Sequence, residues 1–379
     1  MRILQLTSDW KWTGPAEPML HAVKGLRERG HDVDAAFPST PAGHAGALPE
    51  RARERGIAPV FEPAAGQGYL PWRDAAEVRR LRVFLAARRY DVVHATHARA
   101  HLLARFAMGK RAGGTALVAG WTHGDPIPRR PWNRWLYGPA GCDGVAVLCE
   151  RLAEDTRAWL GGPPSRVGVV SGVVDTARFA PRVRRADLRE SLGLKPEQRV
   201  IGLVARLQPH RRVDLILEAL SRALATAPNL RLLVVGRGTR ARQVLEDPVQ
   251  KLGLDAAVIR AGYLRGDEYL DVLAQLDALV YLVPGSDGSC RAALEAMSLG
   301  VAAIASRRGA LPDLLGETAL YCDERPGELA AAFTSVARDP AAWSARGEAA
   351  QQHAREQFAI EAYAARSEAF YAGVRARRA

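Results

Sequence analysis

Two carboxylates in the second half of the chain have a type and spacing that indicate chemistry. Asp287 and Glu295 have seven residues between them; Asp287 is in a turn-rich loop and Glu295 inside a predicted helix, for which Ser289 is the expected N-cap. The apolar run at residues 278–283 is typical of a buried strand, and ligands of open α/β sheets bind beyond such strand ends. Carboxylates there would hold sugar hydroxyls. In the alternative interpretation, Asp287 caps the helix and Glu295 pairs with Arg291.

Two arginines at an earlier strand end supply the opposite charge. Arg206 follows the strand predicted at residues 199–205, and Arg211 lies in the turn before the helix predicted at residues 213–225. Guanidinium groups form charge-assisted hydrogen bonds with phosphate oxygens. The pattern predicts a diphosphate site; the alternative is a pair of solvated arginines in a basic protein.

Three further patterns were weighed for cofactor or metal chemistry. Gly236 and Gly238 open a Gly-x-Gly-x-x-Ala sequence after a predicted strand, but no acidic residue closes a following strand as a dinucleotide fingerprint requires. His123 ends another predicted strand and would donate to a substrate hydroxyl, or else be a structural turn histidine. His97 and His101 are four positions apart without a third ligand at a fitting spacing, so no metal is expected.

The charge of the chain is strongly basic, with 53 Lys and Arg against 41 Asp and Glu, a net charge of +12. Such a surface suits anionic ligands, nucleic acid or an anionic bilayer, although it also fits a composition that merely aids solubility. The basic and aromatic segment at residues 125–137 and the arginine-rich helix predicted at residues 75–89 leave open a peripheral membrane contact. No nucleic-acid recognition module is visible, so no nucleic-acid partner is expected.

Strands and helices are predicted to alternate along the whole chain, which favours an α/β fold with parallel sheets. The 379 residues suit two domains, and a charged, proline-bounded break at residues 180–198 marks their boundary. No apolar run reaches the roughly 18 residues of a membrane span, and the start of the chain turns polar too early for a signal peptide. The four cysteines have no metal or redox spacing. We therefore expect a cytoplasmic protein.

Taken together, these motifs resemble the GT-B family-4 retaining glycosyltransferases, the group 1 glycosyltransferases. Residues 204–211 resemble the family's Gly-Arg-Leu…Lys-Gly segment, with Arg211 in place of the lysine. Asp287 and Glu295 resemble its Glu-x7-Glu element. Residues 236–240 are similar to its Gly-x-Gly-x-x-Arg sequence, residues 262–263 to a glycine turn at the nucleotide base, and residues 171–179 to the motif that ends the N-terminal domain.

This resemblance implies two Rossmann-like doubly wound domains that face each other across a cleft. Residues 1–180 would form the acceptor domain and residues 181–357 the donor domain, with the C-terminal helix, about 358–379, returning to the first domain. The implied activity is a retaining hexosyl transfer from a nucleotide-diphosphate-sugar donor to a hydroxyl of a glycan or glycolipid, in cell-surface polysaccharide or glycolipid synthesis. It implies neither a metal nor another cofactor.

The resemblance also assigns roles to individual residues. The implied catalytic residues are Arg206, Arg211, His123 and Asp287. The implied donor-binding residues are Gly14, Arg206, Arg211, Gly236, Arg240, Tyr263, Asp287, Gly288, Ser289, Cys290, Arg291 and Glu295.

The chain also departs from the family pattern. Asp287 is one methylene shorter than the usual glutamate, and Ser289-Cys290 replaces the usual Phe-Gly. Arg212 stands where a glycine is usual, and Pro15 stands where a second glycine would donate from its backbone. Two alternatives therefore stay open: a nucleotide-sugar epimerase of the same architecture, and a non-catalytic nucleotide-sugar-binding subunit.

Overall fold

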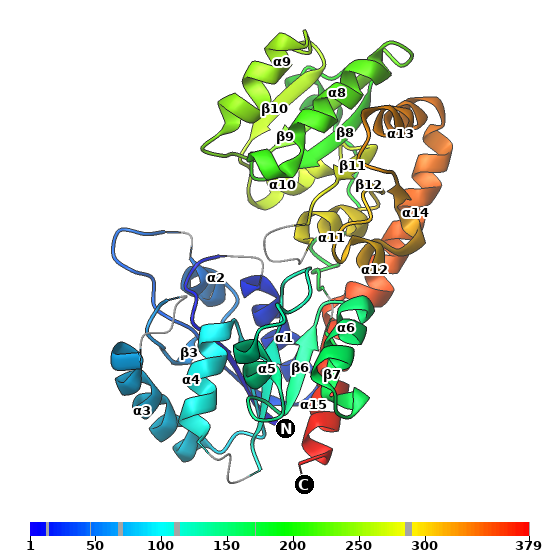
Figure 1. Cartoon of the computed structure of the whole chain (residues 1–379). Coiled ribbons are helices and arrows are strands. Elements are labelled where there is room, and N and C mark those ends of the chain that lie inside the picture. Colours follow the sequence, from blue (N-terminus) through cyan, green and yellow to red (C-terminus); the bar gives the residue numbers. More distant parts are fainter. Residues whose placement is uncertain are drawn as a thin grey trace. The chain divides into compact units, whose positions relative to one another are not determined.

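The computed structural model describes residues 1–12, 15–45, 47–66, 71–109, 114–170, 172–284 and 290–378 (Figure 1). The chain divides into two compact units. Unit 1 includes Met1–Val173 and Ile360–Ala379, and unit 2 includes Val174–Pro284 and Cys290–Ala359. The composition break had predicted the division slightly later, at residue 180.

Within the described residues, a parallel sheet of seven strands forms the centre of unit 1, in the order β3-β2-β1-β4-β5-β6-β7. Ile3 of β1, an inner strand, pairs with Val33 on one side and with Val92 on the other, and all three are buried. Apolar runs of this kind suit parallel strands that helices cover. The strands are β1 (Arg2–Thr7), β2 (Asp32–Ala36), β3 (Pro59–Phe61), β4 (Val92–Thr96), β5 (Ala116–Gly120), β6 (Gly144–Val147) and β7 (Val167–Val169).

The C-terminal helix belongs to unit 1, as predicted, and lies beside α1 (Figure 1). A Cβ on Gly25 of α1 would lie 2.8 Å from the Cβ of Ala364, so glycine permits the close packing of α1 on α15. The Tyr371 hydroxyl of α15 also bonds Gln5 Nε2 at 3.0 Å and His94 Nδ1 at 2.6 Å. The helices of unit 1 are α1 (Ala16–Glu28), α2 (Leu48–Glu54), α3 (Pro71–Arg88), α4 (Ala98–Met108), α5 (Pro131–Tyr137), α6 (Glu150–Leu160) and α15 (Ile360–Ala376).

Unit 2 repeats this plan with a second parallel sheet, whose described strands follow the order β10-β9-β8-β11-β12-β13. Its strands are β8 (Arg199–Val204), β9 (Leu230–Val235), β10 (Val258–Gly262), β11 (Ala278–Tyr281), β12 (Ala303–Ala305) and β13 (Leu320–Tyr321). Its helices are α7 (Ala186–Ser191), α8 (Val213–Leu224), α9 (Asp247–Lys251), α10 (Gly266–Leu273), α11 (Arg291–Ser298), α12 (Leu311–Leu315), α13 (Pro326–Arg338) and α14 (Pro340–Phe358). Two Rossmann-like units with parallel sheets confirm the predicted α/β class.

Helices α2, α5 and α13 are not among the elements predicted from the sequence. Pro49, Pro131 and Pro326 each stand in the first turn of one of them. Proline is well suited to that position because the first turn needs no backbone donor there. Before α9, Arg242–Glu246 forms a π-helical segment. Among the described helices, none is long and apolar enough to cross a membrane.

Candidate functional site

Backbone hydrogen bonds tie together three loops at the carboxyl edge of the unit 2 sheet. Ala205 N donates to Val235 O at 3.1 Å, so the loop after β8 continues alongside the end of β9. Leu207 N donates to the carbonyl oxygen of residue 237 at 3.2 Å, and Gly236 N donates to the carbonyl oxygen of residue 262 at 2.7 Å. The loops after β8, β9 and β10 therefore form one frame.

The glycines of the predicted Gly-x-Gly motif permit this close contact. A Cβ on Gly236 would lie 2.0 Å from Ala205 O, and Gly236 has a φ of +142°. A Cβ on Gly238 would lie 2.1 Å from Leu207 O. Side chains cannot be accommodated at such distances from a backbone oxygen, which gives both glycines a packing role. The predicted donor contact of Gly236 stays a prediction, as does that of Arg240, whose exposed side chain bonds Gln243 Oε1 at 3.4 Å.

The two predicted diphosphate-binding arginines lie on this frame. Arg206 follows β8, is exposed, and has no hydrogen bond or ion pair with another described residue. Arg211, half-buried in the turn before α8, donates from Nη1 to Val283 O and Pro284 O, both at 3.0 Å. Burial first, and then the charges of Arg211 and Arg206, lower the pKa of His210. Both guanidinium groups therefore act on one imidazole, which indicates a local excess of positive charge.

Arg212 stands where the family resemblance implies a glycine. Its backbone adopts the left-handed conformation that glycine favours. Its φ and ψ are 57° and 36°, in the left-handed region. That region costs a non-glycine residue roughly 1–2 kcal/mol. Arg212 Nη1 is 2.6 Å from Oε2 of Glu324. The same oxygen accepts a hydrogen bond from Arg308 Nη2 at 2.7 Å. Arg212 Nε also lies 3.8 Å from Asp214 Oδ1, so two carboxylates hold the substituted side chain.

Helix α11 begins one residue later than predicted. Cys290 occupies the N-cap position with a φ of 49° and no side-chain cap, so the prediction that Ser289 caps this helix is wrong. The left-handed backbone of Cys290 turns the chain directly into α11. The predicted donor contacts of Cys290 and Arg291 stay predictions, and Asp287, Gly288 and Ser289 lie outside the described residues.

Glu295 is buried, with 7% of its surface exposed, and its two carboxylate oxygens have different neighbours. Tyr269 of α10 donates to Oε2 at 2.6 Å, and Arg291 Nε lies 3.7 Å from Oε1. The ion pair between Arg291 and Glu295, which the alternative interpretation predicted, is therefore present. The tyrosine hydroxyl stays protonated because burial, followed by the charge of Glu295, raises the pKa of Tyr269 well above its ordinary value. No motif in the sequence marks Tyr269.

Tyr263, the predicted neighbour of the nucleotide base, lies between two arginines. The guanidinium carbons of Arg237 and Arg265 lie 4.5 Å and 4.9 Å from its ring centroid. The ring is 51% exposed despite these contacts. Cation–π attraction fixes the ring beside the tied loops. Sequence reasoning missed both arginines, because each is an ordinary loop arginine in a chain rich in them.

His123 of unit 1 lies in the exposed loop after β5. Its ring centroid is 4.6 Å from that of Trp121, whose Nε1 donates to Asp125 O at 2.8 Å. The structure thus places His123 at the carboxyl edge of its sheet, where a substrate contact was predicted. Gly14, the other predicted residue of this unit, lies outside the described residues.

The two histidines considered as a metal pair, His97 and His101, have structural partners. His97 Nδ1 is 3.1 Å from Thr7 Oγ1, and His97 has a φ of 78°, which is unusual for a residue other than glycine. His101 Nε2 is 3.3 Å from Gly141 O. The two histidines have different partners, and in the part of the chain that the structure describes no group of three His, Cys, Asp or Glu side chains has a metal-binding arrangement.

Two family models each match about half of the chain. Residues 14–178 match the model described as Glycosyltransferase Family 4. Residues 184–355 match the model described as Glycosyl transferases group 1. The two matches follow each other along the chain in the order of its two Rossmann-like units.

Individual proteins resemble the chain at lower identity. A D-inositol 3-phosphate glycosyltransferase of Rhodococcus opacus (strain B4) is 33% identical over 226 residues, 57% of this chain and 50% of that protein. The chain thus spans about half the length of that relative. The structure of Anabaena Alr3699/HepE in complex with UDP and glucose has a TM-score of 0.75 at 18% identity, covering 98% of this chain and 99% of that one. A glycosyltransferase from Rickettsia africae ESF-5 has a TM-score of 0.82 at 13% identity, covering 98% of both. These two structures share the fold.

Proposed function

The chain belongs to the group 1 glycosyltransferases of the GT-B fold, and on this premise we propose that it transfers a sugar from a nucleotide-diphosphate-sugar donor to an acceptor hydroxyl with retention. The proposal depends mainly on the environment of Arg206. This residue lies on the frame of tied loops, is exposed, and has no hydrogen bond or ion pair with another described residue. Arg211 adds positive charge beside it. A basic, rigid strand end suits a diphosphate, because preorganised cations stabilise the charge that develops on a leaving group.

In the proposed reaction the bond between the anomeric carbon and the donor phosphate breaks as the acceptor oxygen bonds the same face of the sugar. The acceptor proton passes to the departing phosphate oxygen. Arg206 and Arg211 stabilise that diphosphate, so the reaction needs no metal ion. Arg211 also positions the chain at Val283 and Pro284, the last described residues before Asp287. His123 is proposed to donate to a sugar hydroxyl, and Asp287 to accept from one.

The proposed division of the nucleotide-binding residues follows the strand ends of unit 2. Tyr263 contacts the base, Glu295 accepts from the ribose hydroxyls, and Arg206 and Arg211 bind the diphosphate that follows the ribose. The solved Anabaena structure named above contains UDP and glucose, which supports a nucleoside diphosphate as the ligand of this fold. The acceptor is proposed to be a glycan or glycolipid hydroxyl in cell-surface synthesis. The Rhodococcus relative is named for D-inositol 3-phosphate, itself a hydroxylated ring.

The direct test is a panel of nucleoside diphosphates and their sugars, measured by protection of the purified chain against thermal unfolding. A ligand at 100 times its dissociation constant stabilises the native state by about 2.7 kcal/mol. We expect at least one nucleotide sugar to raise the unfolding temperature and to be hydrolysed or transferred. If a nucleotide sugar protects the chain against unfolding but is neither hydrolysed nor transferred, the result would favour the binding subunit. An epimerised sugar formed without acceptor would favour the epimerase, and no protection would reject all three.

Helix α5 supports a second part of the proposal, peripheral contact with an anionic membrane. Trp132 is 51% exposed and stacks on Trp135, with ring centroids 4.9 Å apart. Arg130 and Arg134 are exposed on the same short segment. Indole rings favour the interface between water and lipid, and basic side chains are attracted to anionic headgroups.

Part of the basic face of helix α3 is not available for this contact. Arg80 pairs with Glu77 at 2.9 Å and Arg88 with Asp34 at 3.3 Å, so part of its basic face is neutralised within the protein. Co-sedimentation with phosphatidylserine vesicles at low salt tests the contact, with phosphatidylcholine vesicles as the control. Binding to the anionic vesicles should weaken in Trp132→Ala and at high salt. Absence of binding at low salt would remove membrane contact from the proposal.

A further inference from the structure

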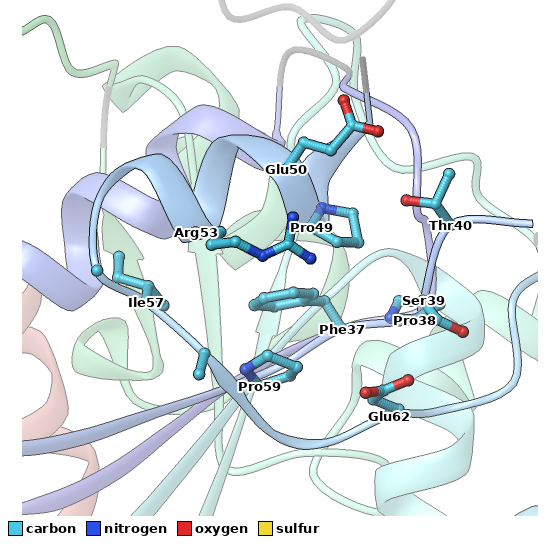
Figure 2. Close-up of a pocket in the computed structure, with 12 residues that line it drawn as sticks. Phe37, Pro38, Ser39, Thr40, Pro49, Glu50, Arg53, Ile57, Pro59 and Glu62 are labelled. Atoms are coloured by element: carbon cyan, nitrogen blue, oxygen red, sulfur yellow. The ribbon is translucent and has the colours of Figure 1, made fainter. Parts of the chain in front are cut away.

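A pocket of about 620 Å³ lies between α2 and the ends of β2 and β3 in unit 1 (Figure 2). It is separate from every residue discussed above as a donor or catalytic group. In Figure 2 the ring of Phe37, one of the lining residues, lies between Arg53 on one side and Pro59 on the other. A volume of this size matches pockets that hold small organic ligands.

The inner wall of the pocket is apolar. Phe37 is fully buried, and Ile57 is 3% exposed. Pro49 of α2 and Pro59 of β3 line the pocket with them. The two prolines are partly exposed, and their rigid rings offer a surface on which the C–H face of a ring can pack without loss of side-chain freedom.

The rim of the pocket carries polar groups of complementary kinds. The carboxylates of Glu50 and Glu62 are acceptors, the guanidinium of Arg53 is a donor, and the hydroxyl of Thr40 is both. Arg53 is exposed, and its side chain has no hydrogen bond or ion pair with another described residue. The three ionised groups sum to one negative charge, in a chain whose net charge is +12.

We propose that this pocket binds a neutral saccharide unit. A pyranose ring combines an apolar face with hydroxyl groups at its edges, as the wall and rim require. An anionic ring would face two carboxylates against one guanidinium. A purely apolar ligand would desolvate three ionised groups without replacing their hydrogen bonds, which is costly.

Two backbone bonds connect the pocket walls to the carboxyl end of β1. Leu48 N, at the start of α2, donates to Trp10 O at 2.9 Å. Beyond Glu62, Gly66 N donates to Ser8 O at 3.1 Å. Both walls are therefore anchored to the loop after β1. On the proposed transfer function, on which this point rests, the saccharide is a unit of the acceptor that lies beyond the hydroxyl being glycosylated.

The test measures binding of lactose, cellobiose and maltose to the full chain by saturation-transfer NMR, with glucuronic acid as the anionic probe. Glu62→Ala and Arg53→Ala each remove one polar rim group from an exposed position. Glu54→Ala and Lys24→Ala are the matched controls, because both side chains are exposed and neither lines the pocket. Loss of a hydrogen bond to a charged group should weaken disaccharide binding about tenfold.

We expect at least one neutral disaccharide to bind, to bind about tenfold more weakly to Glu62→Ala and Arg53→Ala, and to bind the two controls normally. Failure of all three disaccharides to bind, or equal binding by all variants, would overturn the inference. Preferential binding of glucuronic acid that depends on Arg53 would also overturn it. Thermal protection by UDP, measured on the same samples, separates the two proposals: its absence counts against the transfer function and leaves the pocket result standing.

Discussion

The hydroxyl of Tyr269 donates a 2.6 Å hydrogen bond to Oε2 of Glu295, while Arg291 Nε lies 3.7 Å from the other carboxylate oxygen. Tyr269 is on α10, whereas the two charged residues share α11. The carboxylate is thus oriented from a second helix before any ligand binds. An acceptor group held in place in advance loses less freedom when a ribose binds.

Tyr269→Phe tests whether this orientation matters for the donor. The substitution removes the hydroxyl and keeps the ring, so the fold should be retained while Glu295 loses the hydrogen bond from Tyr269. We expect the dissociation constant for UDP to rise about tenfold, since a hydrogen bond to a charged group contributes roughly 1.5–3 kcal/mol. Isothermal titration calorimetry measures the change, and Tyr371→Phe in unit 1 is the control that should leave UDP affinity unchanged. If Tyr269→Phe binds UDP as wild type does while Glu295→Ala loses UDP affinity, the hydroxyl of Tyr269 does not contribute to UDP binding.

Gly238→Ala should destabilise unit 2, because the added Cβ would lie 2.1 Å from Leu207 O, a backbone atom with little freedom to move. We expect a loss of about 2–3 kcal/mol in free energy of unfolding, typical of overpacked sites. Gly327→Ala is the matched control, since no atom lies within 4 Å of a Cβ placed there. Urea unfolding followed by circular dichroism compares the two. Equal stability of both variants would contradict the tied-loop frame.

Burial lowers the pKa of His94 from 6.5 to about 4. Between these values the unfolded chain binds a proton that the folded chain excludes, so acid favours unfolding and stability falls as the pH falls. We expect unit 1 to lose on the order of 2 kcal/mol between about pH 7.5 and pH 5 from this group. Seven of the eight tryptophans, all but Trp343, lie in unit 1, so tryptophan fluorescence during urea unfolding follows that unit.

His94→Gln is the comparison that isolates this effect, because glutamine does not titrate. The variant should lose most of the difference in stability between the two pH values, even if it is less stable at both. An unchanged pH dependence would show that other groups cause the acid sensitivity.

The alternation of strands and helices was sufficient to predict two parallel-sheet units. Short, continuous apolar runs are typical of parallel strands that helices cover on both faces. Proline misled the prediction locally. Pro131 and Pro326 begin helices, but a proline in isolation is equally typical of a loop. Whether it begins a helix depends on the packing of the residues after it, which a single sequence does not reveal.

The candidate site was predictable where a residue directly follows a strand, as Arg206 does. Tyr269 was not, because its contact with Glu295 joins two helices whose relative rotation is set by packing. Arg212 shows a different limit. The sequence identified the replacement of a glycine, but only the structure shows that the left-handed backbone is kept and that Glu324 binds the side chain.

The central claim is that Arg206 stabilises a departing diphosphate. The decisive measurement is the release of nucleoside diphosphate from the nucleotide sugar identified by thermal protection, comparing wild type, Arg206→Ala and Arg222→Ala. Arg222 is the control, an exposed arginine of α8 paired with Glu218. The account predicts a loss of turnover of about 100-fold or more in Arg206→Ala, with an unchanged unfolding temperature and a normal rate in Arg222→Ala. Turnover of Arg206→Ala close to that of wild type would contradict it.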